Sequence, residues 1–182
     1  MKTRFLTVLL LVSVLAVSCK IDKKDDTGTP NGDSKENGSQ GLKVTFNAVV
    51  DKDDNFQLFF NEDGTENFTG DQMIDLPIKG STESQELVFV LPEDVAATNF
   101  RFDIGSNGTL KEVKFGDFKM EYNGKTFKAD GKDFFKYFYP NDQVVLDTIA
   151  EVAKITPKAD RPYDPIIGGT LHLQTELGNF YK

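Results

Sequence analysis

The stretch Leu42-Lys43-Val44-Thr45-Phe46-Asn47-Ala48-Val49-Val50 decides the fold class, because apolar and polar side chains alternate along most of it. A period of two places the apolar side chains on one face of a β-strand and the polar ones on the other. Phe56, Leu58 and Phe60 repeat the alternation after the polar turn 51–55. The two stretches therefore predict a β-hairpin with one face toward a core.

Short apolar runs separated by turn residues continue along the rest of the chain. Asn123-Gly124 predicts a tight hairpin, and a phase shift in the apolar pattern around Gly116-Asp117 indicates a β-bulge or a bend. The run Leu87–Leu91 is apolar throughout, which is consistent with a strand buried on both faces. We predict strands at 42–50, 56–60, 73–78, 85–91, 100–104, 110–122, 126–127, 144–152 and 170–177.

One segment departs from the period of two. Phe134, Phe135 and Phe138 have helical spacing, and Asp130 can cap a helix N-terminus, so we predict a single helical turn there. Many short strands, regular turns and little helix predict an all-β fold. We expect an antiparallel β-sandwich, jelly-roll-like, with at most a short helical turn.

Three of the strand sequences resemble those of a known class of binding module. Phe56-Gln57-Leu58-Phe59-Phe60, Leu87–Pro92 and Phe100-Arg101-Phe102-Asp103-Ile104-Gly105 resemble the β-sandwich modules of the galactose-binding and carbohydrate-binding type. The resemblance lies within residues 42–122 and consists mostly of strand patterns, so it carries over no binding residue. It implies a sandwich that binds carbohydrate.

The N-terminal segment has the layout of a secretory signal peptide. Lys2 and Arg4 precede the apolar run Phe5–Val17, which is shorter than the roughly 20 residues that a transmembrane helix needs. Leu15-Ala16-Val17-Ser18-Cys19 resembles the lipobox of bacterial lipoproteins, which implies cleavage before Cys19 and acylation of its thiol and new amino group. The alternative is an ordinary secreted protein with one free thiol.

The segment after Cys19 predicts a spacer. Residues 20–26 carry mixed charge and resemble the acidic signals that direct some Gram-negative lipoproteins to the outer face of the outer membrane; a simple solvated spacer is the alternative. Residues 27–41 are almost entirely small and polar, which is typical of a flexible linker. We therefore predict a signal peptide at 1–18, a lipidated cysteine and linker at 19–41, and one β-sandwich domain at 42–182.

The charge excludes one class of partner. The formal net charge of −8 becomes −10 once Lys2 and Arg4 are removed with the signal peptide. An acidic chain without a basic patch does not neutralise phosphates, so we expect no nucleic-acid binding. The expected partners are a membrane, reached through the lipid anchor, and a glycan or an envelope protein.

The residues available for catalysis are few, and we predict that the protein is not an enzyme. Cys19 is the single cysteine and His172 the single histidine, and we place His172 on the exposed face of a strand. Paired carboxylates could still hydrolyse a glycosidic bond, but no motif surrounds any such pair.

The candidate ligand-binding residues are Arg101, Asp103, Tyr137 and Tyr139. Arg101 and Asp103 share a strand face and could hydrogen-bond sugar hydroxyls; a surface ion pair is the alternative. With no tryptophan in the chain, Tyr137 and Tyr139 are the best candidates for an exposed aromatic pair; packing between sheet and helical turn is the alternative.

Two further sites are predicted on turns. Asp51, Asp53 and Asn55 place oxygen ligands at the spacing of a calcium loop, but Phe56 replaces the glycine that an EF-hand requires. They predict a looser calcium site, with a solvated acidic turn as the alternative. Asp147-Thr148-Ile149 resembles a short O-glycosylation signal of some bacteria, which would place a glycan on Thr148.

The sequence thus leads to two functional hypotheses. The first is a non-catalytic lipoprotein of the outer membrane that binds extracellular carbohydrate. The second is a structural or assembly lipoprotein that contacts another envelope protein through its sheet surface.

Overall fold

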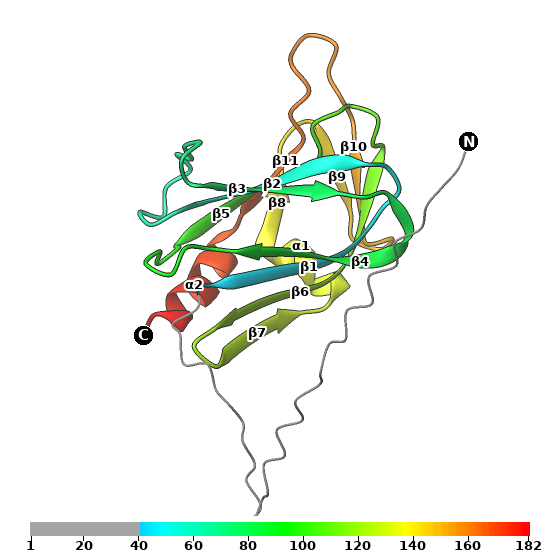
Figure 1. Ribbon diagram of the computed structural model, residues 1–182. Helices are drawn as coiled ribbons and strands as arrows, with labels where there is room; N and C mark the ends of the chain where they lie inside the picture. The colour runs from blue at the N-terminus through cyan, green and yellow to red at the C-terminus, as the bar shows by residue number, and fades with distance from the viewer. Residues whose placement is uncertain (1–40) are drawn as a thin grey trace, which may run out of the picture. The chain divides into compact units, whose positions relative to one another are not determined.

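The domain consists of two antiparallel β-sheets packed face to face, as seen in a computed structural model that describes residues 41–182 (Figure 1). The predicted all-β sandwich is confirmed. Sheet A has the order β4(Ser81–Val90), β1(Lys43–Val50), β6(Glu112–Tyr122), β10(Val152–Ile155), β9(Val144–Asp147), with β7(Lys125–Ala129) paired to β6. Sheet B has the order β3(Met73–Ile78), β2(Asp54–Asn61), β5(Asn99–Asp103), β11(Ile166–Gly169), β8(Phe138–Pro140).

Phenylalanine rings fill the space between the sheets. Phe46 of β1 stacks on Phe102 of β5 with 4.4 Å between ring centroids and an angle of 5° between ring planes. Both side chains are fully buried. Because one ring comes from each sheet, this stack joins the two layers directly, and burial of such rings is the dominant favourable contribution to folding.

Two short helices complete the domain. Helix α1 (Gly131–Tyr137) is capped by Asp130, whose side chain accepts a hydrogen bond from the Asp133 N–H, as the sequence predicts. The helix is longer than the single turn expected. The ring of its Phe134 stacks on that of Phe115 with 4.4 Å between the ring centroids. It therefore inserts an aromatic side chain into the core rather than lying on the surface.

The predicted strand at 170–177 is wrong. This segment is helix α2 (Leu171–Phe180), which Thr170 caps through a hydrogen bond from the Leu173 N–H. Its buried side chains, Leu173, Leu177 and Phe180, recur at helical spacing. His172 consequently lies on an exposed helix surface instead of a strand face.

The hairpin turn predicted at the end of β6 and the irregularity predicted within this strand are both confirmed. Asn123 and Gly124 adopt φ values of 48° and 77° and join β6 to β7, as a two-residue hairpin turn requires. Between the pairs Phe46–Phe118 and Ala48–Phe115, one residue of β1 faces two residues of β6. Of the two alternatives that the sequence predicts around Gly116-Asp117, a bulge or a bend, the structure has the bulge.

Three other strand predictions need correction. β1 and β2 do not form a hairpin, since β1 pairs with β4 and β6 while β2 pairs with β3 and β5. The turn between them carries the chain from sheet A to sheet B. The run Leu87–Leu91 is buried on one face only: Leu87 and Phe89 are buried, whereas Val90 is 54% exposed on the outer face of sheet A. The predicted strand 144–152 is divided by a turn into β9 and β10.

The sequence does not predict strand β11 (Ile166–Gly169), because the strand follows Pro165 and contains two glycines, which are poor strand formers. It lies between β5 and β8. Within residues 41–182, no helix is long and apolar enough to cross a membrane.

Candidate functional site

The outer surface of sheet B brings several of the predicted ligand residues together. Arg101 of β5 pairs in register with Phe59 of β2 on one side and with Gly168 of β11 on the other. Gly168 in turn pairs with Tyr139 of β8. We call this surface the sheet B face and define it by Phe59, Arg101, Asp103, Gly168 and Tyr139.

Arg101 is held in place by a bidentate ion pair and by aromatic contacts. Its Nε donates a 2.8 Å hydrogen bond to Asp103 Oδ1, and its Nη2 donates a second, also of 2.8 Å, to Asp103 Oδ2. The guanidinium lies 4.1 Å from the centre of the Phe59 ring and 5.9 Å from that of Phe68. A guanidinium has five N–H donors, so these two bonds leave donors for a ligand.

Burial and charge act on this pair in opposite directions. Burial raises the pKa of the Asp103 carboxyl, the hydrogen bonds and charge of Arg101 lower it, and the charge of Asp164 raises it, for a net rise. Burial lowers the pKa of Arg101, but the hydrogen bonds and charge of Asp103 and the charge of Asp164 together outweigh burial, so this pKa is also raised. Arg101 therefore stays cationic at every physiological pH.

Tyr139 supplies the aromatic surface of the sheet B face. Its side chain is 41% exposed, and its hydroxyl donates a 2.8 Å hydrogen bond to Glu66 in the loop after β2. Burial and the Glu66 interaction raise the pKa of Tyr139 to about 12. The ring lies against Gly168, where an added Cβ would stand 2.6 Å from Tyr139 Cζ. The glycine is thus what lets the ring lie close to the sheet.

The predicted pair of exposed tyrosines is not formed. Tyr137 ends α1, is partly buried and packs edge-on against Phe127 with 5.1 Å between centroids. Tyr139, two residues later, belongs to β8 on the outer surface of sheet B. The change from helix to strand after Tyr137 separates them, so Tyr137 takes the packing role that the sequence left open.

A second row of the same surface is polar. Gln57 pairs in register with Asp75 on one side and Asp103 on the other. The amide groups of Gln57 and Asn55 each donate a 2.8 Å hydrogen bond to Asp75 Oδ1. Amide and carboxylate groups of β2 and β3 thus extend the polar part of this surface on the side of β5 away from Tyr139.

The three residues of the predicted calcium site have separate partners. Asp51 pairs with Lys52, and Asp53 pairs with Lys79 and accepts the Gly80 N–H, which lowers the pKa of Asp53. The side chain of Asn55 is directed to Asp75. In residues 41–182, no three His, Cys, Asp or Glu side chains are grouped closely enough to hold a metal ion.

Of the two predicted modification sites, Thr148 and Cys19, the structure describes only Thr148. Thr148 is exposed in the turn between β9 and β10, which Asp147 caps by accepting the Ile149 and Ala150 N–H groups. Cys19, together with the predicted signal peptide and nearly all of the linker, lies outside the described residues.

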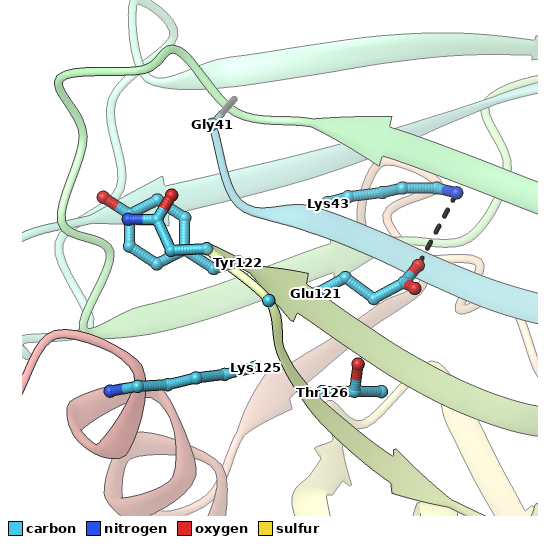
Figure 2. Close-up of a pocket in the computed structure, with 8 residues that line it drawn as sticks. Gly41, Lys43, Glu121, Tyr122, Lys125 and Thr126 are labelled. Atoms are coloured by element: carbon cyan, nitrogen blue, oxygen red, sulfur yellow. Dashed lines mark ion pairs between the residues drawn. The ribbon is translucent and has the colours of Figure 1, made fainter. Parts of the chain in front are cut away.

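A pocket of about 300 Å³ lies at the β6–β7 hairpin, beside the start of the domain (Figure 2). Lys43 and Glu121 face each other across it at 3.6 Å, and Glu121 also pairs with Lys119. Figure 2 shows Lys125 directed away toward α2, where its ammonium donates to the carbonyls of Asn179, Phe180 and Lys182. None of the predicted ligand residues lines this pocket, so we take the sheet B face as the candidate site.

Sequence reasoning missed the residues that support Arg101 and Tyr139. Phe59 and Phe68 come from other elements than Arg101, and Glu66 is 73 residues from Tyr139. Of these residues, only Phe59 is indicated by the sequence: Phe59 and Phe60 are adjacent in one strand, so one of the two rings must point away from the core.

The comparisons with known proteins give no relative: no protein-family model matches the chain, no curated protein is similar to it, and no solved structure matches its fold.

Proposed function

We propose that this protein is an exported lipoprotein that binds extracellular carbohydrate through the sheet B face and is not an enzyme. The observation that carries the proposal is the arrangement of Arg101, Asp103 and Tyr139 on one surface, around Gly168. The proposal for the anchor rests on the sequence before and including Cys19. Two or more acyl chains would hold the domain stably at a membrane, which we propose to be the outer membrane.

The chemistry of a sugar suits this surface. A sugar ring has apolar C–H faces and a rim of hydroxyl groups, each of which donates and accepts hydrogen bonds. The Tyr139 ring offers a flat apolar area, and the free N–H groups of Arg101 and the oxygens of Asp103 offer donors and acceptors. A pre-formed ion pair is already ordered, so little conformational entropy is lost on binding.

The test is a screen of the full chain on a glycan array, with two variants of one residue. Tyr139→Ala removes the ring, and we expect it to weaken binding about tenfold or more, as for an anchoring aromatic residue. Tyr139→Phe keeps the ring and loses only the hydrogen bond to Glu66, so it should bind nearly as well as the parent. Tyr137→Phe is the control outside the sheet B face.

Two results would contradict the proposal. One is glycan binding that Tyr139→Ala leaves unchanged. The other is a correctly folded chain that binds no glycan on the array.

The second candidate is an assembly protein that contacts another envelope protein. Val90 on the edge strand β4 and Val145 on the edge strand β9 are 54% and 53% exposed. Exposed edge strands can pair with a strand of another protein. A photo-reactive residue introduced at position 90 in cells should then cross-link to one discrete protein, whereas a lack of any cross-link would count against this candidate.

A further inference from the structure

A polar groove lies on the outer surface of sheet A, on the side of the sandwich opposite the sheet B face. It has a volume of about 200 Å³ and is formed by side chains of β1, β4, β6 and β7. We call it the sheet A groove. Its lining residues are Thr45, Asn47, Glu86, Asp117, Lys119 and Lys128.

The β-bulge of β6 shapes this groove. Asn47 faces both Gly116 and Asp117, so the bulge opens the ladder beside the Asn47 amide. A Cβ on Gly116 would stand 3.3 Å from the Asn47 Cβ, so any larger residue there would crowd Asn47. Bulges often redirect side chains next to functional sites. Here the bulge sets Asp117 and Asn47 at the same point of the groove.

The floor of the groove contains a polar group that lacks a partner. Thr45 is only 3% exposed, and its hydroxyl has no hydrogen-bond partner among residues 41–182. Its neighbours across the sheet are Val88 of β4 and Lys119 of β6. An unsatisfied buried hydroxyl is unfavourable, so a ligand group that hydrogen-bonds to it would remove that cost.

The charges of the lining cancel. Lys128 pairs with Asp117 at 2.6 Å, and Lys119 pairs with Glu121 at 3.0 Å. These pairs leave the Glu86 carboxylate without a lysine partner in the described part of the chain. Two acids and two lysines line the groove, so neither an anion nor a cation is attracted to it by net charge.

We propose that the sheet A groove is a second binding site and that its ligand is one neutral sugar ring. Glu86 accepts hydrogen bonds, Lys119 donates them, and Thr45 and Asn47 do both. Hydroxyl groups satisfy all four residues, because they both donate and accept, whereas a phosphate or an ammonium satisfies only some of them. The groove is smaller than the pockets that hold drug-sized ligands. The proposal does not depend on the sheet B face, which carries a different set of residues.

The probes are glucose, galactose, mannose and N-acetylglucosamine, each alone, with the full chain in saturation-transfer NMR. We expect saturation of at least one of these neutral sugars. Thr45→Val should weaken its binding about fivefold and Glu86→Gln about tenfold, the range for a neutral and a charge-assisted hydrogen bond. Tyr139→Ala, on the opposite face, should leave the binding of these sugars to the groove unchanged.

A thermal melt separates loss of binding from loss of folding. Thr45→Val is nearly isosteric and removes a hydroxyl without a partner, so its Tm should equal or exceed that of the parent. In the Tyr139→Ala background, which removes the proposed sheet B site, binding of the neutral sugars that survives Thr45→Val and Glu86→Gln, or the absence of any binding, would overturn the proposal. Saturation of glucuronate or glucosamine in preference to every neutral sugar would also overturn it, because the groove would then select a charge.

Discussion

Replacing Phe46 with Ala tests whether the two sheets share one aromatic core. The Phe46 side chain is fully buried, and its ring centroid lies 4.4 Å from that of Phe102 and 5.1 Å from that of Phe118. Removing a buried phenylalanine side chain costs about 3–5 kcal/mol, more where the surroundings cannot close the cavity. Because rigid rings from both sheets surround this site, we expect about 4–5 kcal/mol, a large part of the roughly 5–15 kcal/mol that stabilises a typical domain.

Urea unfolding followed by far-ultraviolet circular dichroism measures this loss. The midpoint should fall while the slope of the free energy against urea stays the same, since the surface exposed on unfolding hardly changes. Val145→Ala is the control, because Val145 is 53% exposed on an edge strand and should change stability by less than about 0.5 kcal/mol.

A double-mutant cycle then tests the contact between the sheets. Phe46→Leu and Phe102→Leu, alone and combined, should show a coupling energy of about 0.5–1.5 kcal/mol, the range for a stacked aromatic pair. Strictly additive effects, or a Phe46→Ala loss as small as that of Val145→Ala, would refute the face-to-face packing of β1 on β5.

Three further predictions concern local structure and pH. Asp130→Ala removes the N-cap of α1 and should cost about 1 kcal/mol in the same assay; an unchanged midpoint would contradict the cap. Gly124→Ala forces a side chain into a φ of 77° and should cost more than about 1 kcal/mol, although the site is open. The pKa values of Tyr139, Tyr163 and Tyr181 are raised to about 12, chiefly by burial. The folded state therefore holds these protons more tightly than the unfolded state, and stability should be lost as pH rises from about 10 to 12. In a pH titration of the folded protein, a rise in phenolate absorbance with its midpoint near 10 would refute this prediction.

One part of the candidate site could be predicted from the sequence, and another part could not. Arg101 and Asp103 are predicted to share a strand face because they are two residues apart in one strand, and they form an ion pair there. Tyr139 joins them only because β11 lies between β5 and β8 and has a glycine at position 168. No local pattern predicts that neighbourhood, since it depends on which strands are adjacent.

The sequence by itself determined the local features of this protein. Alternation over 42–50 makes a one-sided strand, Asn123-Gly124 makes a tight turn because both residues tolerate positive φ, and Asp130 caps a helix. The tertiary structure decided what depends on distant partners. β1 and β2 joined different sheets, and the run that starts at Leu87 became part of the edge strand β4. Residues 171–180 became a helix because Leu173, Leu177 and Phe180 could reach the core together. Strand pairing and burial gain their free energy from residues far apart in the chain, and a local pattern does not contain that information.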